Sequence, residues 1–410
     1  MCAAARLRLP PVRCACAPRA FASTLRRVRP GLVRELPFAV GLVFALLVLF
    51  AFGFAERRAE IFRIGDFSGF WAGARALLLG LDPYDSRTWL ATTVELGTQR
   101  PDTAVYGYPP HVALALLPLA LLPLEAAAAV WAFATMTIAA FGVRALLRTA
   151  LPDARIAHTL TGLALFGSQP AITSFVIGQW TFLLVGCVSF AAAAALRGRE
   201  AAGLLLTPLF AKPQLALAAP FAVVLALPGR RLRTVAMMTA VAAVLAIAGW
   251  LAAPGWLGAW TAAVPGRRVD VLPRNATTWG ASVDLFGGPG LFLAALVVVA
   301  GALALLRFAG RPAAALAATL ALGHVVAPYS WAYDQLLLLV PAIVAAAALP
   351  ARLGALCVAG VSALLVFISP LLYAVAVTRG RESLSGIVPV AVFAALVVLL
   401  WRDRRALPSA

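Results

Sequence analysis

Acidic residues are scarce in this chain, and many of them gather in one segment. Sixteen of its 410 residues are Asp or Glu. Between residues 55 and 105 lie Glu56, Glu60, Asp66, Asp82, Asp85, Glu95 and Asp102. Asp66 lies just beyond the first hydrophobic span, where charged groups are costly and usually functional. We expect the chemistry of the protein in this segment, although an Asp66 oxygen could also cap a helix.

The single lysine, Lys212, is the second candidate. Lys and Arg together number 34, and Lys212 stands between two hydrophobic arms in the sequence Phe210-Ala211-Lys212-Pro213-Gln214. An ammonium group and a planar guanidinium are not equivalent, so a lone lysine among arginines indicates a specific requirement. The lysine needs an anionic partner, either a carboxylate or a phosphate. A snorkelling side chain or one buried ion pair is the structural alternative.

Polar residues also stand where two hydrophobic spans begin. Gln179 follows Gly178 at the start of one span, and Tyr333 and Asp334 precede another. These side chains could line one pocket, although polar residues at span ends are common in membrane proteins. Both readings stay open from the residues alone.

No residue pattern indicates a metal or a nucleotide. The histidines His111, His158 and His324 are scattered, and no Cys, His and Asp cluster has zinc spacing. The chain contains neither GxxxxGK[ST] nor GxGxxG, which gives no support to an ATP-driven pump or a soluble nucleotide-sugar site. We expect neither a metal nor another cofactor.

Hydrophobic helices must position these residues. The chain is 63% hydrophobic with a mean hydropathy of +0.94, and its apolar runs approach the roughly 20 residues that cross a bilayer. Helices are the structure that satisfies the backbone over such runs. The sequence predicts an all-α polytopic membrane protein with about 10–12 transmembrane helices. The predicted spans are 37–54, 125–147, 157–175, 177–196, the pair 201–211 and 213–227, 231–253, 287–307, 312–328, 335–349, 353–373 and 387–401.

We expect a single integral domain over 37–401, with a basic cytoplasmic tail over 1–36 and a short cytoplasmic tail over 402–410. Two outside loops, 55–108 and 254–286, are long enough to fold. The arms of the pair within 201–227 are too short for full crossings. That pair is therefore predicted to be a hairpin, bent at Lys212-Pro213, that enters from the cytoplasmic side.

Arginine content predicts which face is cytoplasmic. With a cytoplasmic N-terminus, the inside segments hold 22 arginines and four acids, which accounts for the whole net charge of +18. The outside segments hold 11 arginines and 11 acids. We therefore expect both termini in the cytoplasm and the acidic loop outside. The positive charge orients the protein and contacts anionic lipids, and nothing in it indicates a nucleic-acid partner.

The outside loops contain short helical patterns. Apolar residues recur at helical spacing over 68–80, where Gly80 fits the helix end. This helix is expected to lie on the membrane surface, with Phe70 and Trp71 in the headgroup region. Residues 109–123 are apolar but broken by prolines, which predicts a second surface or re-entrant helix.

Taken in order, several segments resemble glycosyltransferase family 87, a GT-C type family of integral membrane glycosyltransferases. The matching pieces are Gly65-Asp66-Phe67 with Phe70-Trp71-Ala72, Leu79-Gly80 with Asp82-Pro83-Tyr84-Asp85, Tyr108-Pro109-Pro110 with Leu117-Pro118-Leu119, Gly178-Gln179, Lys212-Pro213-Gln214, and Pro328-Tyr329-Ser330-Trp331 with Tyr333-Asp334. Each piece is weak alone, but their order over about residues 40–345 is specific.

The resemblance implies a hexosyltransferase, and a mannosyltransferase by the family's usual choice of sugar. It implies a polyprenyl-phosphate sugar donor and a lipid or glycan acceptor of the cell envelope. Transfer would take place on the extracytoplasmic face of a bacterial inner (plasma) membrane, without a metal. Asp66 matches the family's catalytic acid. Some members carry histidines after the late Ser-Trp, whereas Tyr333 and Asp334 occupy that region here, which puts any histidine-dependent role in doubt.

An inverting transfer needs one base for the acceptor hydroxyl and a cation for the departing phosphate. We hypothesise that Asp66 is the base and that Lys212 or an arginine of 254–286 holds the phosphate. The expected substrate-binding residues are Lys212, Gln179, Tyr108, Tyr333, Asp334, Arg267, Arg268 and Arg274.

Two other classes stay open. A non-enzymatic transporter or a flippase for lipid-linked glycans would also use intramembrane charges and broken helices, often with inverted repeats. No internal repeat is evident, and the acids cluster in an outer loop rather than at mid-membrane. A related scaffold without activity is the third class, against which the retained Asp66 argues.

Overall fold

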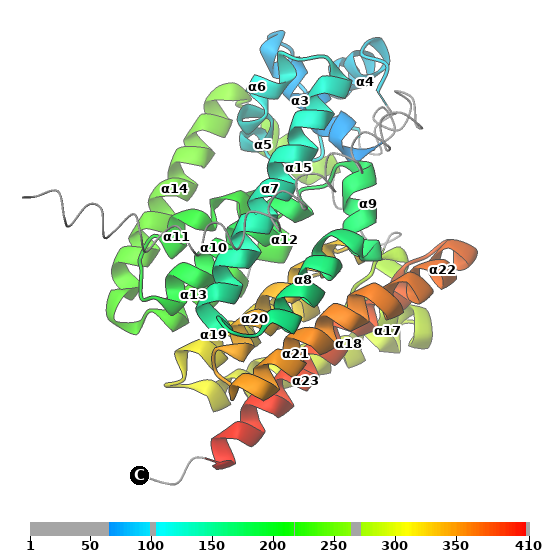
Figure 1. The fold of residues 1–410 in the computed structure, drawn as a ribbon. Helices are drawn as coiled ribbons and strands as arrows, with labels where there is room; N and C mark the ends of the chain where they lie inside the picture. The colour runs from blue at the N-terminus through cyan, green and yellow to red at the C-terminus, as the bar shows by residue number, and fades with distance from the viewer. Residues whose placement is uncertain (1–64, 99–103, 217, 264–271, 407–410) are drawn as a thin grey trace, which may run out of the picture. The chain divides into compact units, whose positions relative to one another are not determined.

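The computed structural model describes residues 65–98, 104–216, 218–263 and 272–406 (Figure 1). These residues are 81% helical and contain no strand, which confirms the all-α prediction. The expected tail over 1–36 and the expected span over 37–54 lie outside the described residues.

Six helical segments in the described chain are long and apolar enough to cross a membrane. They are α7 (Leu124–Ala150), α8 with α9 (Arg155–Gly167 and Gln169–Ile177), η2 with α14 (Pro228–Arg230 and Arg231–Ala252), α18 with η4 (Pro289–Leu305 and Leu306–Phe308), α21 with η6 and α22 (Ala351–Ala363, Leu364–Ile368 and Ser369–Arg379), and η7 with α23 (Ser383–Gly386 and Ile387–Ala406). This finding confirms a polytopic membrane protein.

Several other apolar helices are shorter than a bilayer. They are α10 (Thr181–Leu196), α11 with η1 (Ala202–Leu205 and Thr207–Ala211), α19 (Pro312–Val326) and η5 with α20 (Ala332–Leu338 and Leu339–Ala346). The 16 residues of α10 span about 24 Å, against about 30 Å of hydrocarbon. Because Trp180 and Thr181 at its start are buried, this end of α10 lies within protein. The helix α10 therefore brings the polar Thr181 into the interior.

The predicted hairpin within 201–227 is bent where the sequence indicated. The 3-10 helix η1 ends at Ala211, and α12 (Pro213–Ala216) and α13 (Ala218–Ala226) follow. Lys212, between η1 and α12, has φ −128° and ψ 71°, outside the helical region. The cause is the following proline, which disfavours helical backbone in the residue before it. The bend places Lys212 at the tip of the two arms.

The described residues before α7 form four short helices, α3 (Asp66–Leu78), α4 (Ser86–Glu95), α5 (Pro110–Ala115) and α6 (Leu117–Ala120), which are blue to cyan in Figure 1. Gly80 has φ +71° and follows α3, as predicted. The expected position of its aromatic residues in the headgroup region was wrong. Phe70 and Trp71 are 1% and 7% exposed, because α3 packs against α5 and α6 and the Trp71 indole donates to the Leu122 carbonyl.

Two glycines let α7 and α10 pack closely. A Cβ on Gly142 would lie 2.3 Å from the Gly186 carbonyl oxygen. We expect Gly142→Ala to lower the free energy of unfolding by about 1–3 kcal/mol, since the backbones must separate. Thermal unfolding in detergent measures this effect. Gly162→Ala on α8 is the control, because nothing lies within 4 Å of a Cβ there; equal destabilisation by both variants would contradict the close-packing argument.

Candidate functional site

Asp66 lies at the start of α3 and is held by a residue distant in sequence. Gly65 is the N-cap, and no side chain caps the helix, so the capping alternative for Asp66 was wrong. Its carboxylate instead accepts a hydrogen bond from the Gln179 side chain, 113 residues away. Asp66 remains exposed. An oriented and accessible carboxylate can accept a proton from a bound ligand.

The position of Gln179 depends on Gly178. Gly178 ends α9 in the left-handed conformation with φ +70°, and its carbonyl accepts a hydrogen bond from the Trp131 indole at 3.0 Å. A Cβ on Gly178 would lie 2.5 Å from the Phe67 Cβ. Only glycine combines this backbone conformation with so close an approach.

Gly178→Ala is therefore expected to separate Gln179 from Asp66 and to reduce the activity of the site by about tenfold or more, since small misplacements at a reacting group are costly. The activity of purified protein, normalised to folded protein, measures the loss. Gly198→Ala is the control, because Gly198 has a similar φ of +69° with nothing within 4 Å of a Cβ. Equal losses from both variants would contradict the argument.

Lys212 and Asp334 form a buried ion pair. The Lys212 ammonium lies 2.9 Å from Asp334 Oδ1, and the two side chains are 4% and 1% exposed. The same Oδ1 accepts from the Thr181 hydroxyl at 3.2 Å, and Oδ2 accepts from the Trp331 backbone N–H at 3.2 Å. The Lys212 ammonium also lies 4.8 Å from the Tyr333 ring centroid. The anionic partner that Lys212 requires is thus a carboxylate.

Tyr108 connects the Asp66 and Asp334 groups. Its ring packs edge-on against Phe70 of α3 with centroids 4.8 Å apart. Burial raises the pKa of the Tyr108 hydroxyl well above its usual range, and the nearby carboxylates of Asp66 and Asp334 add to this shift. Gln179 and Thr181, two residues apart, contact Asp66 and Asp334 respectively. Six sequence-predicted residues come together in this site: Asp66, Gln179, Tyr108, Lys212, Tyr333 and Asp334.

Of the three arginines predicted to bind substrate, the structure describes only Arg274. Arg267 and Arg268 lie outside the described residues. Arg274 ends η3 (Leu272–Arg274) with an exposed side chain, and its carbonyl accepts the Glu382 backbone N–H at 2.9 Å. Glu382 in turn accepts the Ala332 N–H at the start of η5 at 2.8 Å. Arg274 is thus two hydrogen-bonded steps from the element that carries Asp334.

Sequence reasoning missed Thr181 and Glu382. Thr181 follows the Gly178-Gln179 pair by two residues, and this proximity could have drawn attention to it. Glu382 had no comparable signal, because it stands in a short loop far along the chain from every other site residue. Its contact with η5 exists only in the folded structure.

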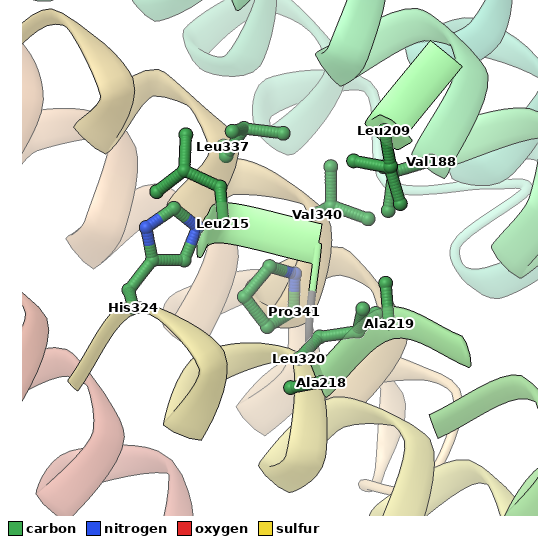
Figure 2. A pocket seen from close by; sticks show the side chains of 10 residues that line it. All are labelled: Val188, Leu209, Leu215, Ala218, Ala219, Leu320, His324, Leu337, Val340 and Pro341. Atoms are coloured by element: carbon green, nitrogen blue, oxygen red, sulfur yellow. The ribbon is translucent and has the colours of Figure 1, made fainter. Parts of the chain in front are cut away.

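A small cavity is lined by residues of several elements (Figure 2). Leu209 and Leu215 flank Lys212 along the chain, and Leu337 and Val340 follow Asp334. The cavity volume is about 20 Å³, which fits about one water molecule and no sugar. His324 of α19 faces it among apolar side chains.

The predicted sidedness stays a prediction, and three ion pairs each join residues that it places on one face. Arg230 and Arg233 both pair with Glu200, all three assigned to the cytoplasmic face. Arg381 pairs with Asp284, both assigned to the outer face. Each of these contacts joins residues of one predicted face. In the described residues no group of three or more His, Cys, Asp or Glu side chains could hold a metal ion; independence from a metal stays a prediction.

Apolar spans around a recessed polar site define an integral membrane protein with a candidate active site. The model of glycosyltransferase family 87 matches residues 106–329. The match covers more than half of the chain. The chain therefore belongs to this family and is a membrane glycosyltransferase. It includes Tyr108, Gln179 and Lys212, whereas Asp66 and Asp334 lie outside the matched range. No curated protein matches the chain, and no solved structure does.

Proposed function

We propose that the protein is an inverting hexosyltransferase that uses a polyprenyl-phosphate sugar, with mannose as the first candidate, and a lipid or glycan acceptor. The observation that carries this proposal is the exposed Asp66 carboxylate, oriented by Gln179 and close to a buried polar cluster. Family membership supports glycosyl transfer, and the carboxylate supplies the group that such a transfer requires.

Asp66 is the general base in this proposal. The acceptor hydroxyl gives its proton to the carboxylate while its oxygen forms a bond to the anomeric carbon of the donor. The bond from that carbon to the phosphate oxygen breaks, and polyprenyl phosphate leaves with the electron pair. The logic is that of the base in inverting glycosidases, in which one carboxylate activates the attacking oxygen. Phosphate is a good leaving group, so no general acid is needed.

A cation near the departing phosphate would stabilise its developing charge. Lys212 is less suited to contact the departing phosphate directly than its place in the sequence suggests, because its ammonium is buried and paired with Asp334. The exposed Arg274 is the candidate among the described residues, together with Arg267 and Arg268. We propose that these arginines bind phosphate and that Lys212 supports the site from within.

We propose that transfer takes place on the extracytoplasmic face of a bacterial inner membrane. The arginine distribution supports this orientation, since the net charge lies on the opposite face from the Asp66 loop. Both termini would then be cytoplasmic. Cysteine labelling of an engineered residue at exposed Asp82 with an impermeant reagent in intact cells tests the orientation.

The test of the function is hexose transfer from labelled polyprenyl-phosphate mannose in membranes that contain the protein, against membranes that lack it. We expect protein-dependent incorporation from the lipid-linked donor and none from a soluble nucleotide sugar. Incorporation only from another polyprenyl-phosphate hexose would replace mannose and keep the reaction class. Movement of a lipid-linked glycan across vesicles without transfer from any donor would favour a flippase and overturn the proposal.

A further inference from the structure

A short outer segment between α22 and α23 holds the second large loop. This segment, residues 379–386, is called the strap below. Asp284 of α17 (Thr278–Phe286) pairs with Arg381 and accepts from the Ser383 hydroxyl at 2.5 Å. The Asp284 side chain is 2% exposed. A Cβ on Gly386 would lie 2.0 Å from the Thr277 carbonyl oxygen, so the strap backbone is tightly placed against the start of α17.

The other side of the strap contacts the start of η5. Glu382 Oε2 accepts the backbone N–H of Ala332 at 2.8 Å, and the Ser385 carbonyl accepts from the Gln335 side chain at 2.6 Å. The strap therefore holds η5 on both sides of Asp334.

These contacts determine where Asp334 points. The first N–H groups of a helix have no partner within it, and at η5 two carboxylates supply acceptors. Glu382 accepts a hydrogen bond from the Ala332 N–H, and Asp334 accepts one from the Trp331 N–H. With the first turn fixed in this way, the other oxygen of Asp334 is directed at Lys212 and Thr181.

Holding a carboxylate at this place is unfavourable for stability. Burial raises the pKa of Glu382 above its ordinary 4.5, and Asp334 raises it further, while the Ala332 N–H acts in the opposite direction. The stability contribution of such a group is present below its unfolded pKa and is lost as pH rises through the folded pKa. Ionised Glu382 therefore lowers stability at neutral pH, and residues of this kind are concentrated at functional sites.

The charged groups around Glu382 do not compensate for this cost. Asp334 of η5 is a like charge. Arg381 and Arg379 of the strap are turned to Asp284, and Arg274 of η3 meets Glu382 through its backbone carbonyl.

We propose that Glu382 is a positioning residue of the transfer site, which holds the first turn of η5 and thereby directs Asp334 toward Lys212. This inference rests on the proposed hexosyl transfer. The strap then acts on the transfer site through η5 and does not touch the reacting atoms.

Two variants of Glu382 separate its hydrogen bond from its charge. In Glu382→Gln an oxygen can still accept the Ala332 N–H, whereas Glu382→Ala removes both the acceptor and the charge. We expect Glu382→Ala to lower kcat by about tenfold or more with KM little changed, because Asp334 loses its direction. Glu382→Gln should restore most of this kcat and melt no lower than wild type at neutral pH.

Asp284→Asn is the matched control on the other side of the strap, expected to lower stability while the pH profile keeps its shape. Hydrogen exchange of the Ala332 amide provides a readout independent of transfer: it should accelerate in Glu382→Ala and stay slow in Glu382→Gln. Unchanged exchange and kcat in Glu382→Ala would overturn the inference, as would a loss explained by folded protein alone. A wild-type protein without transfer from any donor would instead overturn the proposed function, while the exchange data still test the position of η5.

Discussion

Replacing Asp66 with asparagine is expected to reduce hexose transfer by about 10²- to 10⁴-fold, the range that general bases contribute. The asparagine oxygen can still accept from the Gln179 side chain, so the geometry of the contact at Asp66 is retained. The substitution removes the negative charge and with it the ability to take a proton. Transfer from labelled polyprenyl-phosphate hexose by purified protein measures the effect, and donor binding should remain close to wild type.

Asp82→Asn is the control for this experiment. Asp82 is another exposed acid of the same loop, and an asparagine oxygen can still accept the Tyr84 N–H that Asp82 Oδ1 accepts at 2.8 Å. We expect transfer by this variant to stay close to wild type. Normal turnover in Asp66→Asn would show that the base is elsewhere, and an equal loss in both variants would point to the fold of the loop.

The second large effect is expected at the ion pair between Lys212 and Asp334. Removing one partner leaves an uncompensated buried charge, so Lys212→Met or Asp334→Asn alone should destabilise the protein by about 3–5 kcal/mol. The double variant should recover part of this loss, with a coupling energy of about 0.5–3 kcal/mol. Unfolding of all four proteins in the same detergent gives this energy directly.

Measuring glycosyl transfer by the double variant shows whether the Lys212–Asp334 pair contributes only to stability or also to the function of the site. The stabilised double variant should remain deficient in transfer, because it lacks the charges next to Tyr333 and Thr181. Full transfer by the double variant would reduce the pair to a structural feature. Arg233→Met is the control, since its partner contact with Glu200 is at the surface, with an arginine 80% exposed, and such pairs contribute about 0–1 kcal/mol.

The sequence by itself determined the class of protein and most of its helices. Apolar runs of bilayer length predict helices wherever they occur, since the period and length of such runs are local properties. The bend at Lys212-Pro213 and the end of α3 two residues before Gly80 were predictable for the same reason: proline and glycine act on the backbone within one or two residues. The motif order also led to the right family before any fold was known.

Only the tertiary structure decided which of these residues meet. Gln179 could be seen as a polar residue at a span end, but its contact with Asp66 crosses 113 residues, and the Lys212 contact with Asp334 crosses 122. The sequence left the partner of Lys212 open between carboxylate and phosphate. It also assigned Phe70 and Trp71 to the lipid headgroups, although both pack inside the protein. An apolar pattern predicts that one face of a helix is buried. Which part of the protein covers that face depends on segments far away in the chain. Glu382 is the clearest case, because its role depends wholly on the place where the strap meets η5.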